Sequence, residues 1–197
     1  LRNIKQSKVD YAANEAVFSF LKADKTVFDV EFQVSNNNIA FRYKVHPQKE
    51  TRSCVVKRES TGFVFPEGTT TFLCPQMKPM TGFARTAPSY ETDYTPDDEM
   101  GKNGWGFGYT FPCLFKVNDA GWVLISETGV DSRYCASRLV GNEDKSYSIG
   151  YPLQEENNGN GTNTAGIPLP GYTPWRTITV GETLAPIVET TIPFDVV

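Results

Sequence analysis

The sequence predicts an all-β protein, an antiparallel β-sandwich with long connecting loops, and three observations lead to this class. Apolar and polar residues alternate with a period of two, most clearly over 28–34 and 39–45, as in strands with one buried face. The 197 residues include 16 glycines and 13 prolines, which favour turns over helices. No long segment has the apolar periodicity of a helix.

The expected strands follow the short apolar runs in chain order. They are 15–21, 27–34, 39–45, 53–58, 62–65, 70–74, 109–117, 122–127, 133–140, 146–151, 175–180 and 184–189. The Asn-rich turn 35–38 joins the second and third strands into a hairpin. Alternation places Phe28, Val30, Phe32, Phe41 and Tyr43 toward the core.

Two long connections, 80–108 and 154–174, separate groups of strands. The first is rich in acids, glycine and aromatics, and the second in asparagine, glycine and proline. Loops of this length inside a compact domain are usually functional or mobile. There is no internal repeat and no clear domain boundary, so residues 1–197 are expected to form a single domain.

Composition excludes some classes of partner. The 19 basic and 23 acidic residues give a net charge of -4, whereas a nucleic-acid surface normally carries a basic excess. No apolar run approaches the length of a membrane span. The chain opens on Leu1 and has no signal peptide, so we interpret it as a cut or processed chain.

Cysteine spacing argues against a zinc or thioredoxin-like site. The four cysteines, Cys54, Cys74, Cys113 and Cys135, include no CxxC or CxxH pair. An exported protein could form one or two disulfides from them. The alternative is four buried thiols that pack as small apolar residues, and the sequence leaves the disulfide state open.

Glu127 is the main candidate functional residue. Strand parity places it on the inward face with Val123 and Ile125, at the end of its strand. A carboxylate there is costly unless a cation or hydrogen-bond donors receive it. The structural alternative is a glutamate bound to backbone NH groups or to an arginine.

The other polar residues are weaker candidates for a functional site. Asp131 could pair with Glu127 across a glycosidic bond, but its place after the strand favours a turn cap. The only histidine, His46, precedes Pro47 and has no nucleophile motif. The 101–108 segment, GKNGWGFG, lacks the phosphate-loop pattern. Five acids in the first long loop lack calcium-loop spacing and predict a solvated loop: Glu91, Asp93, Asp97, Asp98 and Glu99.

Aromatic residues in and directly after the first long loop suggest sugar binding or an interface. They are Tyr90, Tyr94, Trp105, Phe107 and Tyr109. If exposed together, they could stack on sugar rings, as in a carbohydrate-binding module. The alternative is burial against another domain, because aromatic residues are enriched at interfaces. Trp122 and Trp175 lie in expected strands and should be mostly core.

Four motifs, in order, resemble the amino-terminal domain of glycoside hydrolase family 97, which comprises secreted bacterial α-glucosidases, α-galactosidases and their relatives. They are an AFRY strand at 40–43, a Pro-Cys-Leu-Phe-Lys strand at 112–116, an Ile-x-Glu segment from 125 to Tyr134, and TPWR-x-I-x-x-G at 173–181. The resemblance covers residue 28 to the end. Thr128-Gly129 departs from the Ala-Asn preferred in the family.

The resemblance implies a supersandwich of the galactose-mutarotase type, without catalytic residues of its own. A catalytic (β/α) barrel would follow residue 197, so this chain alone is expected to be inactive. The domain would brace that barrel, whose substrate is an α-linked oligosaccharide. It would also contribute Glu127 as one ligand of a calcium ion in the barrel's active site. Calcium takes six to eight oxygen ligands, so the barrel would have to supply the others.

The same resemblance implies a secreted or periplasmic protein that binds calcium only in the full-length enzyme, with no cofactor and no calcium in the isolated domain. Glu127 would then have no partner within the sandwich. An independent carbohydrate-binding module is the alternative function. A structural or adhesion domain is a third, because a sandwich does not define a function.

Overall fold

The computed structural model describes residues 7–77, 93–154, 156 and 163–197. Its described residues are mostly antiparallel strands, which confirms the predicted all-β, sandwich-type class. The chain divides into two compact units, each of which is described by itself below. Unit 1 comprises residues 1–55, 122–134 and 166–197, and unit 2 comprises 56–121 and 135–165.

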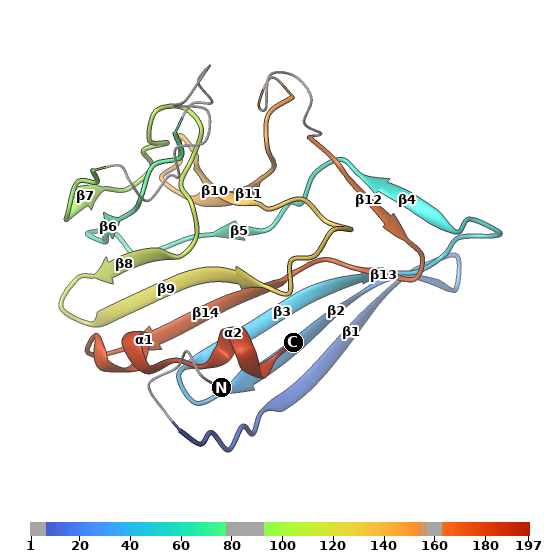
Figure 1. Cartoon of the computed structure of the whole chain (residues 1–197), viewed down its shortest axis with the longest axis horizontal. Helices are drawn as coiled ribbons and strands as arrows, with labels where there is room; N and C mark the ends of the chain where they lie inside the picture. The colour runs from blue at the N-terminus through green and yellow to red at the C-terminus, as the bar shows by residue number, and fades with distance from the viewer. Residues whose placement is uncertain (1–6, 78–92, 155, 157–162) are drawn as a thin grey trace. The chain divides into compact units, whose positions relative to one another are not determined.

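The sheet of unit 1 has the strand order β1-β2-β3-β14-β9 (Figure 1). The bounds of these strands are β1 Asn14–Lys22, β2 Lys25–Ser35, β3 Asn38–Val45, β14 Trp175–Gly181 and β9 Gly121–Thr128. β13 (Gly171–Tyr172) pairs with β3, and β4 (Ser53–Val56) pairs with β12 (Ala165–Pro168). β14 therefore lies between β3 and β9, which both come much earlier in the sequence.

The predicted hairpin between β2 and β3 is confirmed. Ser35 pairs with Asn38 across a two-residue turn, and Asn37 has a left-handed φ of 62°. Asparagine tolerates this conformation better than most residues. The alternation that predicted the two strands places Phe32 opposite Phe41 on one face.

The apolar face of the β1–β3 hairpins is less buried than expected. Phe41 is 9% exposed, whereas Phe28, Val30, Phe32 and Tyr43 are only half-buried. These side chains still pack together, since Phe32 and Phe41 lie 5.6 Å apart by ring centroid. The shared face is therefore as predicted, and the full burial is not.

The predicted strand 184–189 is wrong, because this segment is helical. α1 (Ala185–Glu189) and α2 (Ile192–Asp195) each have a proline in their first turn, where its missing N–H costs nothing. Figure 1 shows both helices lying over the sheet of unit 1. Ile192 and Val196 form a small core with Ala40 and Trp175 on that face.

Unit 2 contains two groups of antiparallel strands. In the first, β6 (Thr70–Phe72) lies between β7 (Asp98–Glu99) and β8 (Cys113–Val117). In the second, β11 (Tyr147–Gly150) lies between β10 (Arg138–Gly141) and β5 (Gly62–Phe63). The predicted strand 133–140 forms only from Arg138, because the turn at Asp131 occupies the residues before it.

The core of unit 2 is aromatic. The ring of Phe115 stacks on Phe65 at 4.2 Å and meets Tyr147 edge-on at 5.4 Å. Arg138 is also buried there and is satisfied by Glu156 at 2.7 Å and by the carbonyl of Phe107 at 3.0 Å. Buried charge is tolerated where such partners are supplied.

The four cysteines are free thiols in the described structure. Cys113 is fully buried, and its Sγ lies 3.3 Å from the carbonyl oxygen of Thr110. Cys54, Cys74 and Cys135 are half-buried. The four cysteines therefore pack as small, mostly buried side chains and form no disulfide in the described structure. Among the described residues, no helix is long and apolar enough to cross a membrane.

Candidate functional site

Glu127 forms a buried ion pair with Arg176. The two residues lie opposite each other on β9 and β14, so their side chains share one face of the sheet. Arg176 Nη1 donates to Glu127 Oε2 at 2.5 Å. The Arg176 side chain is 0% exposed and that of Glu127 is 10% exposed. A charge-assisted bond between a fully buried arginine and a mostly buried glutamate fixes the carboxylate in place.

The expectation that Glu127 lacks a partner within the domain is therefore wrong. The alternative of an arginine-bound glutamate describes the structure instead. A carboxylate has about four lone-pair positions. A carboxylate that is bound by an arginine can therefore also be a metal ligand.

The sheet register explains why the pair is buried. Phe32 lies opposite Phe41, Phe41 opposite Arg176, and Arg176 opposite Glu127, so one row crosses four strands. The ion pair thus continues an aromatic row rather than a polar one. In such surroundings a charge is costly when alone and is strongly bound by a correctly placed partner.

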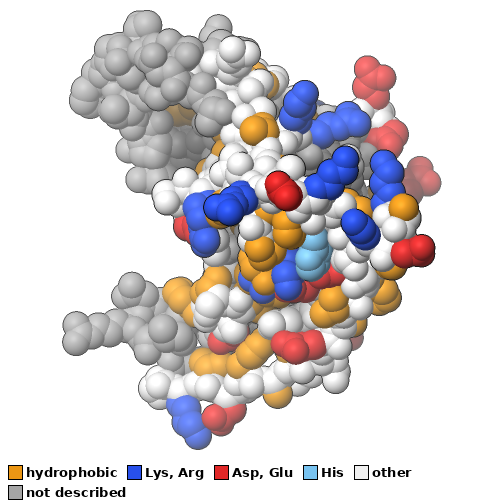
Figure 2. Space-filling view, turned by 90° about the vertical axis from the view of Figure 1, so that its right-hand side faces the viewer, with side chains coloured by type: hydrophobic (Ala, Val, Ile, Leu, Met, Phe, Trp, Pro, Cys, Tyr) orange, Lys and Arg blue, Asp and Glu red, His pale blue; other side chains and the backbone are white. Residues whose placement is uncertain are grey.

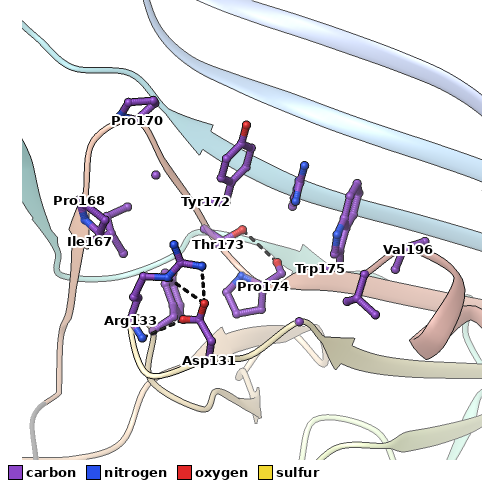
Figure 3. A pocket seen from close by; sticks show the side chains of 15 residues that line it. Asp131, Arg133, Ile167, Pro168, Pro170, Tyr172, Thr173, Pro174, Trp175 and Val196 are labelled. Atoms are coloured by element: carbon purple, nitrogen blue, oxygen red, sulfur yellow. Dashed lines mark hydrogen bonds and ion pairs between the residues drawn. The ribbon is translucent and has the colours of Figure 1, made fainter.

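A pocket of about 360 Å³ lies in unit 1, where β9 ends (Figure 3). Its walls come from the loop after β9, from the segment around β13 and from the chain end at Val196 and Val197. Asp131 and Arg133 point toward each other in this pocket and form an ion pair. Arg133 N also donates to Asp131 Oδ1 at 2.8 Å, which confirms the predicted turn-capping role of Asp131.

One wall of this pocket is a stack of three flat side chains. The Arg42 guanidinium lies 4.1 Å from the ring centroid of Tyr172 and 4.3 Å from that of Trp175. Its Nε also bonds Glu31 at 2.8 Å. Cation–π contacts of this kind orient both rings. Trp175 is buried as predicted, whereas Trp122 is half-buried.

The sequence did not identify Arg42, Tyr172 or Arg176 as site residues. A usable signal was present for Arg176, because alternation along 175–181 places it on the face of Ile178. The stack of Arg42 and Tyr172 depends on β13 pairing with β3, and sequence spacing does not predict that pairing.

The aromatic candidates of the first long loop do not act as one group. Tyr94 and Trp105 are 56% and 55% exposed, and both line a second pocket, in unit 2. Phe107 is half-buried. Tyr109 is a core residue at 5% exposure, held by bridges to Pro75 and Leu139, so it is not part of an exposed aromatic cluster. Tyr90 lies outside the described residues.

The acidic loop shows no metal geometry in its described part. Across residues 7–77, 93–154, 156 and 163–197, no three His, Cys, Asp or Glu side chains are grouped to hold an ion. Asp98 instead pairs with Lys102, while Asp93, Asp97 and Glu99 are exposed. Glu91 lies outside the described residues.

His46 forms a hydrogen-bonded group with Asp29 and Ser19. Its Nε2 lies 2.6 Å from Asp29 Oδ2, and Ser19 Oγ donates to Asp29 Oδ1 at 2.7 Å. The His46 hydrogen bond and then that of Ser19 hold the pKa of Asp29 below its usual value. In Figure 2 the histidine is seen at the surface, among Lys and Arg side chains and hydrophobic ones.

A family profile described as Glycosyl-hydrolase 97 N-terminal matches residues 1–197. The chain therefore belongs to the family of glycoside hydrolase 97 N-terminal domains, as the four motifs predicted.

Solved structures agree with this assignment. "Crystal structure of beta-arabinopyranosidase" is 54% identical, with a TM-score of 0.92 over 98% of this chain and 31% of that one. A Glycoside Hydrolase Family 97 enzyme from Pseudoalteromonas sp. strain K8, in complex with acarbose, is 20% identical, with a TM-score of 0.62 over 91% of this chain and 25% of that one. A variant of the enzyme from that strain is also 20% identical, with a TM-score of 0.64 over 93% and 26%. The two latter matches support the fold alone.

The chain thus spans about a third or less of the solved structures that it matches. No curated protein matches it.

Proposed function

We propose that this chain is the non-catalytic domain of an exported glycoside hydrolase, where it braces a catalytic (β/α) barrel. We further propose that Glu127 is one ligand of a calcium ion that the barrel completes. The observation that carries the proposal is the carboxylate itself, held rigidly at the end of β9 by a fully buried arginine. A preorganised carboxylate loses little freedom when it binds an ion.

The oxygen ligands in the described part of this chain meet only part of what calcium requires. Calcium takes six to eight oxygen ligands, often carboxylates. The described residues supply Glu127 and no cluster of further ligands, so the remaining ones would come from the catalytic domain. When bound, such an ion would stabilise charge that develops beside the reacting bond. The contribution of this chain is to fix one ligand in position.

The pocket where β9 ends supports the bracing role. It opens within a few residues of Glu127 along the chain, and its lining mixes the Tyr172 ring with the Asp131–Arg133 ion pair. Aromatic residues and arginine are enriched at protein interfaces. We propose that a segment of the barrel occupies this pocket in the full-length enzyme.

The calcium proposal is tested with two variants of the full-length enzyme. Glu127→Gln removes a ligand charge and the ion pair, whereas Arg176→Gln removes the ion pair alone. Both variants are expected to be less stable, but Glu127→Gln should weaken calcium binding more than Arg176→Gln does, by roughly tenfold or more, because it alone removes a ligand charge. Calorimetric titration with calcium, at a temperature where both variants are folded, measures this. Equal affinities in the two variants would assign Glu127 to structure alone.

The substrate of the parent enzyme is proposed from the 54% identical beta-arabinopyranosidase. In the L series, a β-arabinopyranoside has the ring configuration of an α-D-galactopyranoside without the exocyclic hydroxymethyl group. The expectation of an α-linked substrate and this relative thus point to one ring geometry. Aryl β-L-arabinopyranoside, α-D-galactopyranoside and α-D-glucopyranoside should be compared with the full-length enzyme. Hydrolysis of the glucoside alone would contradict the proposal.

A further inference from the structure

We propose that unit 2 carries a carbohydrate-binding subsite for one neutral pyranose ring, separate from Glu127 and independent of calcium. The site is the second pocket described above, here called the Trp105 pocket. It has a volume of about 190 Å³. Its defining side chains are Tyr94, Asp98, Lys102 and Trp105, above a floor of Leu73, Pro75 and Tyr109.

Two large exposed rings provide the apolar surface that a sugar needs. Trp105 is 55% exposed and Tyr94 is 56% exposed, although both line the same pocket. Leaving aromatic area in water forgoes the free energy of burial. The apolar C–H face of a pyranose can pack on such a ring, while the hydroxyl groups of the sugar form hydrogen bonds with water or with the protein. The pair is therefore suited to a flat, amphipathic ligand.

The backbone around Trp105 is built to hold this side chain at the surface. Gly104 and Gly106, its two neighbours, have left-handed φ angles of 54° and 91°. A Cβ at Gly104 would lie 2.9 Å from the Pro75 side chain and 3.0 Å from the carbonyl oxygen of Gly108, so the turn requires glycine there. The Gly106 N–H also donates to the carbonyl of Asn103 at 2.9 Å. The position of Trp105 is thus constrained by the turn.

Polar groups beside the rings match the hydroxyls of a neutral sugar. Asp98 and Lys102 form an ion pair in the pocket wall, with side-chain exposures of 20% and 52%. The Asp98 carboxylate is also oriented by the backbone N–H of Glu99 at 2.9 Å. The pair presents an acceptor and a donor side by side with no net charge, which suits adjacent hydroxyls.

Size and charge argue against large or anionic ligands. Pockets for drug-sized molecules are typically about 300–1,000 Å³, so 190 Å³ admits a single ring. Asp93 also lines the pocket, and exposed Asp97 and Glu99 lie close in sequence. These carboxylates disfavour a phosphate or another anion. The rings and the Asp98–Lys102 pair together favour a neutral monosaccharide unit at the end of an oligosaccharide.

The test uses the purified 197-residue chain in EDTA, so that its result does not depend on the calcium proposal. Galactose, arabinose, galacto-oligosaccharides and malto-oligosaccharides are titrated at millimolar concentrations, with binding followed by calorimetry and by NMR. Trp105→Ala and Tyr94→Ala should each weaken binding roughly tenfold, since each removes one stacking ring. Trp105→Phe should restore part of the loss.

The matched control is Tyr172→Ala, which removes a ring of 41% exposure from unit 1. It should leave sugar affinity unchanged. Circular dichroism confirms that the variants are folded, as expected for exposed positions. The proposal is overturned if none of the sugars binds, or if Trp105→Ala and Tyr94→Ala bind as tightly as the original chain.

Discussion

Replacing Glu127 by glutamine should destabilise the domain, because it removes the carboxylate charge that faces the fully buried Arg176 guanidinium. Arg176 is completely buried, and its guanidinium meets the carboxylate at 2.5 Å. Removing one partner of a buried pair typically costs about 3–5 kcal/mol. Glutamine keeps an oxygen that can accept from Arg176, so we expect the lower end, about 3 kcal/mol. For a domain of this size, that corresponds to a melting temperature lower by about 6–12 °C.

The assay is urea unfolding of the purified chain, followed by circular dichroism and checked by calorimetry. Asp131→Asn is the matched control, since it makes the same carboxylate-to-amide change in an arginine pair with exposed side chains. Exposed pairs contribute little, so the control should unfold with the original chain.

A double variant, Glu127→Leu with Arg176→Met, removes both charges and keeps apolar side chains at the two positions. If the cost comes from one uncompensated charge, this variant should be more stable than Glu127→Gln. The reasoning is refuted if Glu127→Gln unfolds within about 0.5 kcal/mol of the original chain, the range of ordinary surface substitutions. It is also refuted if Asp131→Asn is equally destabilising.

Two further predictions concern groups whose pKa the fold shifts. Asp29 has a folded pKa below its usual 3.8, so its stabilisation is present above that pH and is lost as the pH falls through the depressed pKa. Ser19→Ala removes a hydrogen bond to Asp29, so it should cost stability at neutral pH, and the difference in unfolding free energy should shrink in acid; a pH-independent difference would contradict this. Burial raises the pKa of the Cys113 thiol, so Cys113 should react last with Ellman's reagent in the native chain, after Cys54, Cys74 and Cys135. Four reactive thiols are expected in denaturant, and fewer would reveal a disulfide.

The sequence predicted those elements of the fold whose structure depends on neighbouring residues. The alternation over 28–45 determines both strands and the hairpin, because a one-residue slip would turn every apolar side chain outward. Parity also placed Glu127 on the correct face. Its partner was missed because Arg176 is 49 residues away, and which strands become neighbours depends on the tertiary fold.

The errors have similar physical causes. The apolar residues Ile187 and Val188 suggested a strand, but Pro186 starts a short helix whose buried side chain is Ile187. Tyr109 was grouped with the aromatic residues around the first long loop, but its backbone bridges Pro75 and Leu139 and its ring lies in the core. In both cases tertiary contacts overrode a local preference.

The central place of β14 has a consequence for the newly made chain. β3 ends at Val45, and the strand that covers its open edge starts at Trp175, about 130 residues later. At about 5–20 residues per second, a ribosome needs roughly 7–26 s to synthesise the intervening chain. During that interval β3 carries unpaired backbone groups next to a partly exposed aromatic face, and once β9 has been made it too awaits the same strand. Such edges invite pairing between neighbouring molecules. A chain that stops before residue 175 should therefore aggregate rather than persist as a partial sheet, and the step most dependent on chaperones should come just before β14 inserts.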